Sequence, residues 1–242
     1  MNLSIETLLI VGIVGFYLYD SAILVFSNEL IFNESYGCWS VNFPSARWRL
    51  MGKLLYIPNP LTPDNMIFRA IWSTNDEPLQ LDSGEEICKL RLPLSYLRIL
   101  VIVLMVSLVI VFPVVMFKYG TGIELLKVIF FIYFMIINML VYTYIKKDDF
   151  FLNKKAFLSL AFDCLACPPF AINILRKISL RSGLCNNPVE FARKALDLEA
   201  FKIFIAMLAN KVSEDLECED EEDSPRSIEL INFREKILGM LI

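Results

Sequence analysis

Residues 99–117 read ILVIVLMVSLVIVFPVVMF and residues 128–145 read VIFFIYFMIINMLVYTYI, and neither run contains a charged side chain. A helix needs about 20 residues to cross the roughly 30 Å hydrocarbon core of a bilayer. We therefore predict two transmembrane helices, at 97–118 and 123–146. The short Lys-Tyr-Gly-Thr-Gly connection (118–122) predicts a tight antiparallel hairpin between them.

The N-terminal segment 1–27 contains a third apolar run, from Thr7 to Phe26, interrupted by Asp20. It has no basic start and no Ala-x-Ala-like cleavage site, so we expect a retained transmembrane helix and not a signal peptide. An acid inside a membrane segment marks either a proton or ion site or a carboxylate paired at an interface. The second interpretation of Asp20 is favoured, because the residue lies about two-thirds of the way along the run.

A fourth apolar segment, 156–175, reads AFLSLAFDCLACPPFAINIL. Asp163 and Asn173 interrupt it, and Pro168-Pro169 removes two backbone donors from any helix that runs through them. We predict a short helix followed by a break, which is typical of a re-entrant or interfacial segment. A fourth transmembrane helix is the alternative.

The charges of the connections orient these segments. With three crossings and the N-terminus outside, eight basic residues fall on the inner side and two, Lys118 and Lys127, on the outer side. The eight are Arg47, Lys89, Arg91, Arg98, Lys146, Lys147, Lys154 and Lys155. With four crossings the two sides nearly balance. The sequence thus favours three crossings in a plasma or bacterial inner membrane, with the first loop and the C-terminal tail cytoplasmic.

The loop at 28–96 is too long to be a simple connection. Aromatic and branched residues recur over 39–43, 47–57, 66–72 and 87–92, and Pro- and Asn-rich turns separate them. This pattern predicts a small module of four or five antiparallel strands. All three Trp residues lie in this loop, which is typical of a module at the headgroup level.

The C-terminal tail is predicted to be helical and interrupted by acids. Asn187-Pro188 begins a helix over 187–213, and eight of the ten residues at 214–223 are acidic and predict a linker. A last amphipathic helix over 225–242 carries an apolar stripe that we predict docks a partner. The stripe is formed by Leu230, Phe233, Ile237 and Leu241.

Composition narrows the classes of function. The chain is 56% hydrophobic, has a net charge of −4 and contains no His. The acidic balance argues against nucleic acid as a partner, and the absence of His removes the commonest general base and metal ligand. No phosphate-binding glycine loop or nucleophile elbow is present. We therefore expect neither a cofactor nor a metal.

Two alternatives to a non-enzymatic function remain open. Cys164-Leu-Ala-Cys167 is a C-x-x-C pair within an apolar segment, and Cys38 and Cys88 lie in the first loop. This layout resembles the vitamin K epoxide reductase family. The resemblance implies a four-helix membrane oxidoreductase that exchanges disulfides through Cys164 and Cys167. The other alternative is a small oligomeric pore, lined by the polar residues of the spans, which are Asp20, Ser107, Asn138 and Thr143.

The sequence as a whole predicts an α-helical integral membrane protein with three transmembrane helices, a re-entrant segment, a β-rich first loop and a helical tail. The apolar tail surfaces at 201–209 and 230–241 need neighbours. We accordingly expect a membrane-embedded adaptor or sensor subunit that holds a cytoplasmic protein through its C-terminal helices. A homo-oligomer or a larger membrane complex is expected, and Asp20 and Asp163 are its candidate intramembrane polar residues.

Overall fold

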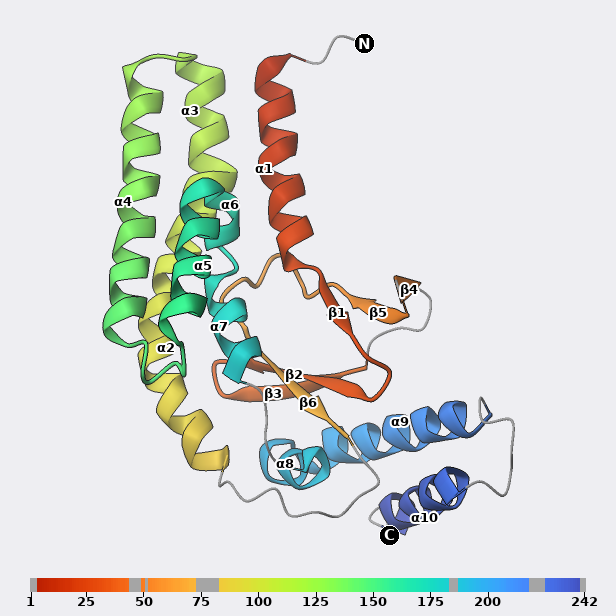
Figure 1. The fold of residues 1–242 in the computed structure, drawn as a ribbon. Helices are drawn as coiled ribbons and strands as arrows, with labels where there is room; N and C mark the ends of the chain where they lie inside the picture. The colour runs from red at the N-terminus through yellow and green to blue at the C-terminus, as the bar shows by residue number, and fades with distance from the viewer. Residues whose placement is uncertain are drawn as a thin grey trace.

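The computed structural model describes residues 4–43, 49–50, 52–72, 83–182, 187–217 and 225–239. The chain is mostly helical, with a small β module of two sheets near the N-terminus. Figure 1 shows α1, α3 and α4 side by side, with the N-terminus and the α3–α4 turn at one end. The strands, α8, α9, α10 and the C-terminus lie at the other end. We call the strands together with α8–α10 the head.

Within the described part of the chain, two stretches are long and apolar enough to cross a membrane, Pro93–Tyr119 and Ile123–Ile145. The first comprises most of α2 (Ser83–Val106), a π-helical turn η1 (Ser107–Val111) and α3 (Phe112–Tyr119). The second is α4 (Ile123–Ile145). The predicted hairpin is present, since α3 ends at Gly120, which adopts φ +66°, and α4 begins directly after Gly122.

A π-helical turn lies directly before Phe112-Pro113. Proline lacks an N–H, so the carbonyl four residues before it loses its usual donor. The turn inserts an extra residue here, and the Phe112 N–H donates to the Ser107 carbonyl, five residues back. The Ser107 hydroxyl donates in turn to the Val103 carbonyl at 2.7 Å.

Helix α1 (Ile5–Ser21) is shorter than the predicted run. Ala22 is extended, and Ile23–Val25 forms strand β1, which pairs antiparallel with β5. The sequence prediction placed these residues in the helix because a buried strand and a membrane segment are equally apolar. Pairing with β5 decides between them, and β5 is distant in sequence.

The segment 156–175 folds as a helical hairpin that begins and ends on the side of the head. Helix α5 (Lys154–Ala166) leads to the short α6 (Pro168–Ala171), and α7 (Ile174–Ser182) returns. The Tyr133 hydroxyl, in the middle of α4, lies 3.5 Å from the Leu165 carbonyl near the tip. The tip therefore lies level with the middle of α4 (Figure 1).

The β module consists of two three-stranded antiparallel sheets. Their strand orders are β1-β5-β4 and β3-β2-β6. The strands are β2 (Glu29–Ser35), β3 (Cys38–Asn42), β4 (Arg49–Leu50), β5 (Lys53–Tyr56) and β6 (Met66–Ile71). Described strands thus fall within the predicted stretches 39–43, 47–57 and 66–72. Residues 87–92 instead belong to α2, because their apolar spacing is compatible with a helix as well as a strand.

The sheet β3-β2-β6 is covered on both faces. On one face Ile31 and Ile67 pack with β1 and with Leu180 of α7. On the other face Phe32 contacts the ring of Phe191 at 5.0 Å and of Phe204 at 6.3 Å. This explains why successive positions of β2 and β6 are buried, and not alternate ones.

The predicted helix 187–213 is broken in two. Helix α8 (Pro188–Ala195) ends at Leu196, which is extended, and α9 (Leu198–Glu217) begins after Asp197, whose carboxylate accepts the Ala200 N–H at 2.7 Å. Helix α9 also includes the first residues of the predicted acidic linker. Helix α10 (Pro225–Leu238) packs against α9.

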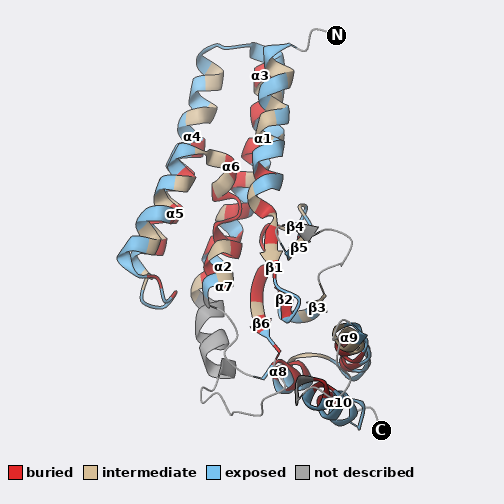
Figure 2. Cartoon of the chain, turned by 45° about the vertical axis from the view of Figure 1, so that its right-hand side comes forward, coloured by how far each residue is buried: buried red, intermediate tan, exposed pale blue. Residues whose placement is uncertain are grey.

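Burial differs along the molecule. Figure 2 shows red, buried residues concentrated where the strands, α2, α6 and α7 meet. The far halves of α1, α3 and α4 are mostly blue and tan. Their apolar side chains therefore face outward, which is the reverse of a soluble core.

Candidate functional site

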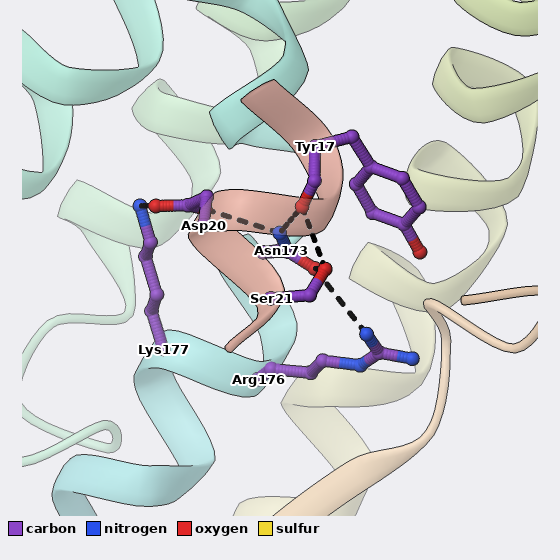
Figure 3. Close-up of polar contacts among 6 residues, drawn as sticks. All are labelled: Tyr17, Asp20, Ser21, Asn173, Arg176 and Lys177. Carbon is purple, nitrogen blue, oxygen red and sulfur yellow. Dashed lines mark hydrogen bonds and ion pairs between the residues drawn. The ribbon is translucent and has the colours of Figure 1, made fainter. Parts of the chain in front are cut away.

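The principal polar cluster joins α1 to α7 and the residue before it, in the returning arm of the α5–α7 hairpin (Figure 3). We call it the joint. It is formed by Tyr17, Asp20, Ser21, Asn173, Arg176 and Lys177. Its central contact is an ion pair in which Lys177 Nζ lies 2.7 Å from Asp20 Oδ1, with both side chains largely buried. The joint therefore connects residues about 150 positions apart in the sequence.

Asn173 organises the joint through its side-chain amide. Its Nδ2 donates to Asp20 Oδ2 at 3.1 Å and to the Tyr17 carbonyl at 3.3 Å. The Ser21 hydroxyl donates to the Tyr17 carbonyl at 2.7 Å and lies 3.2 Å from Asn173 Oδ1. These contacts provide hydrogen-bond partners for buried polar groups of both α1 and the α5–α7 hairpin, near the C-terminal end of α1.

Arg176 extends the joint to the β module. It is buried, and its Nη2 donates to the carbonyls of Asn59 and Thr62 at 2.7 and 2.6 Å. The Tyr17 hydroxyl donates to the Pro60 carbonyl at 2.6 Å. Burial lowers the pKa of Arg176 from its ordinary value, and the nearby Tyr17 opposes that shift.

The sequence of the β5–β6 connection explains why these donors are needed. Residues 57–63 read Ile-Pro-Asn-Pro-Leu-Thr-Pro and contain three prolines, which have no N–H to offer. The segment forms no strand, and the carbonyls of Asn59 and Thr62 accept only long backbone hydrogen bonds, from the Thr62 N–H at 3.4 Å and the Asn65 N–H at 3.3 Å. Buried carbonyls without donors are costly. Arg176 and Tyr17 supply the donors, and thereby fix the connection against α1.

A second buried cluster connects the module to α2. The carboxylate of Glu34 in β2 forms an ion pair with Arg98 of α2, and both residues are buried. The Arg98 guanidinium also lies 4.9 Å from the centre of the Tyr36 ring. A hydrogen bond between the Tyr36 hydroxyl and Asp64 raises the pKa of Tyr36. Arg98, counted above among the basic residues of the inner side, thus anchors α2 to the head.

The candidate cysteines lie close to the joint. Cys164 is buried and Cys167 is half-buried, and both lie within electrostatic range of Asp20 and Lys177. Cys38 is exposed in β3, and the three described cysteine side chains are free thiols. Cys88 has no described side chain. Burial disfavours the thiolate that disulfide exchange requires, so the setting of Cys164 is that of a packing residue.

The other polar residues of the predicted membrane segments lie outside the joint, each in its own setting. Asp163 is half-buried on α5. Ser107, Asn138 and Thr143 each donate to the carbonyl four residues earlier on their own helix, at 2.7 Å. These three side chains satisfy their donors locally, which is how such residues are usually accommodated in a membrane helix.

The predicted docking stripe is covered by the chain itself over its described part. Leu230, Phe233 and Ile237 are buried, and the Phe233 ring stacks on Trp72 at 6.0 Å. Leu241 lies outside the described residues. The apolar side of α9 is buried as well. That these residues hold a partner stays a prediction, and a partner that reached them would have to displace α9 or α10.

A surface hollow at the corner between α8 and α9 was not anticipated from the sequence. It has a volume of about 510 Å³ and is lined by Arg193, Leu196, Leu198, Phe201 and Lys202. Its floor is apolar and its rim carries two cations. The corner exists because the helix breaks at Leu196-Asp197. The sequence prediction of one continuous helix over 187–213 therefore gave no sign of the hollow. A similar volume lies between α3 and α4.

Neither a family model, a curated protein nor a solved structure matches this chain. Among the described residues no group of three Cys, Asp or Glu side chains is arranged to hold a metal ion. The site must therefore be interpreted from its own geometry, as a set of buried polar contacts that hold the membrane-type helices, the hairpin and the head in one arrangement.

Proposed function

We propose that the protein is an integral membrane adaptor or sensor subunit with three spanning helices, α1, α2–α3 and α4. The support is the exposure of apolar side chains on these helices. Only 33% and 28% of the residues in the most apolar windows of the two longest stretches are buried. In a soluble protein such helices would form the core. Lipid is the solvent that accommodates them.

The proposed topology places the N-terminus outside and the head in the cytoplasm of a plasma or bacterial inner membrane. The basic residues support this orientation, because the side of the head carries most of those near the spans. The hairpin α5–α7 enters and leaves on the same side (Figure 1). Helix α1, with 17 residues, would cross with local thinning of the bilayer.

The adaptor function rests on one observation, the hollow between α8 and α9. Its volume of about 510 Å³ is in the range of binding sites. Among the described residues neither Arg193 nor Lys202 at its rim forms an ion pair, and the apolar Leu198 beside them is 71% exposed. An apolar floor with a cationic rim is complementary to a protein segment that carries an apolar side chain between Asp or Glu residues.

A photocrosslinking experiment tests this proposal. p-Benzoylphenylalanine replaces Leu198 in the full chain, and the cells are irradiated before the protein is purified. We expect a specific crosslinked protein, attached through an acidic and apolar segment. Arg193→Glu combined with Lys202→Glu should abolish the crosslink, because both rim charges then repel that segment.

The matched control reverses two exposed charges that do not line the hollow, with Lys194→Glu and Arg234→Glu. It should retain the crosslink. Equal loss of the crosslink in both variants would mean that net charge alone causes it. A crosslink that does not respond to the rim charges would refute docking at this hollow. Native mass spectrometry of the same sample separates a cytoplasmic partner from a second copy of this chain.

A further inference from the structure

We propose that the proline turn, residues 57–63, is a membrane anchor whose apolar tip lies between the lipid headgroups beside α1. This interaction surface belongs to the head and not to the spanning helices. The inference rests on the proposed membrane location. It adds a specific contact between the β module and the bilayer surface.

The proline turn is located at the point where α1 would leave the membrane. Tyr17, which donates to the Pro60 carbonyl, lies four residues before the end of α1. The turn therefore contacts α1 one helical turn inside its C-terminus. Figure 1 shows the connection between β5 and β6 rising from the sheets to this end of α1.

The turn is rigid and directs its apolar side chains outward. Arg176 holds the carbonyls of Asn59 and Thr62, and the Asn59 carboxamide oxygen accepts the Leu61 N–H at 3.0 Å. With the backbone bound from the inside, the Leu61 side chain is 77% exposed and that of Ile57 is 56% exposed. A preorganised turn loses little conformational freedom when it enters the interface.

The surroundings of the tip favour lipid over water. Near the same end of α1, Tyr19 is exposed, and the apolar side chains of Leu18 and Phe16 are exposed as well. Tyrosine is enriched at the headgroup level, where one end of the ring is wet and the other apolar. A single exposed Leu on a soluble loop would need no explanation. Here its position next to an apolar helix surface provides one.

Depth measurements by electron paramagnetic resonance test the anchor. A nitroxide is attached through p-azidophenylalanine at Leu61, with the full chain in nanodiscs of zwitterionic and anionic phospholipid. Its collision rates with oxygen, which partitions into lipid, and with a water-soluble nickel chelate are compared. We expect Leu61 to favour oxygen. The control is Ile71, which is also exposed, at 57%, but lies at the end of β6 farther from the proline turn, and it should favour nickel.

A third label at Phe130 on α4 separates the two proposals. If Phe130 favours oxygen and Leu61 behaves as Ile71 does, the anchor is refuted and the membrane location stands. If Phe130 favours nickel, the membrane location fails, and the anchor fails with it. A further label at Ile57 should agree with Leu61, and Arg176→Met should increase the mobility of the Leu61 nitroxide by releasing the turn.

Discussion

The long helices α3 and α4 expose many of their apolar side chains, whereas the head buries most of its own. Phe130 on α4 is 74% exposed, whereas Phe204 on α9 is buried among the rings of Phe32, Phe43 and Phe201. Both residues are phenylalanines in apolar stretches of helices of 20 residues or more, although only α9 carries a charge, Lys202, within its stretch. The difference shows that the apolar residues of a helix do not by themselves determine whether they are buried, since this depends on the elements packed beside the helix.

The two regions are connected by charged and polar side chains. The pair Glu34–Arg98 fixes α2 to the sheet, and the joint fixes α1 and the hairpin to the module. Buried ion pairs often contribute little net stability, and in some proteins they select one arrangement where apolar contacts would allow several. We infer that these clusters set the orientation of the head relative to the spans.

The largest effect is expected from truncating a ring in the head. Phe204→Ala should lower the free energy of unfolding by about 3 to 5 kcal/mol, because it leaves a cavity between α9 and the sheet. Phe130→Ala should change it by less than about 0.5 kcal/mol, since the ring faces outward. Chemical unfolding in nanodiscs, followed by tryptophan fluorescence, measures both. Equal losses would contradict the contrast between the regions.

The next prediction tests directly whether α4 faces lipid while α9 faces water. Phe134 on α4 and Ile203 on α9 are both exposed, at 55% and 61%. A lysine in the middle of a spanning helix should cost about 2.5 to 3.5 kcal/mol. Phe134→Lys should therefore reduce the fraction of protein that resists extraction from membranes at alkaline pH. Ile203→Lys should leave this fraction unchanged, and equal tolerance of both would place α4 in water.

Much of this contrast follows from the sequence, and the connections between the regions do not. Uncharged length predicts the two longest helices, and Pro168-Pro169 predicts the turn of the hairpin, because both are local properties. The partners of Asp20 are not local, since Asn173 lies 153 positions away. Likewise Trp39 and Trp72, expected near headgroups, pack against Phe191 and Phe233 in the head, because α8 and α10 cover them.

The ion pair of the joint should have an intermediate effect. Asp20→Asn or Lys177→Met alone removes one member and leaves the other partly buried without its charge partner. We expect each to cost about 1 to 3 kcal/mol in the free energy of unfolding. The double variant should cost less than the sum, since the two residues interact. Simple additivity would instead favour Asp20 acting alone, as a proton or ion site requires.

The smallest effect concerns the loss of stability at alkaline pH, and it tests the burial of Tyr56 in the head alone. Burial raises the pKa of Tyr56 in β5, and the charge of Arg176 and a hydrogen bond from Asn42 oppose this shift. Above pH 10 the tyrosine ionises in the unfolded chain while Tyr56 stays protonated in the folded one, so stability is retained below pH 10 and falls as the pH rises further. Tyr56→Phe loses the Asn42 contact, at a cost of about 0.5 to 1.5 kcal/mol at every pH. Its stability should nevertheless decline less steeply above pH 10 than that of the unmodified protein, in unfolding curves recorded from pH 8 to 11. Parallel declines would mean that water reaches the hydroxyl and that the sheet β1-β5-β4 does not shield it.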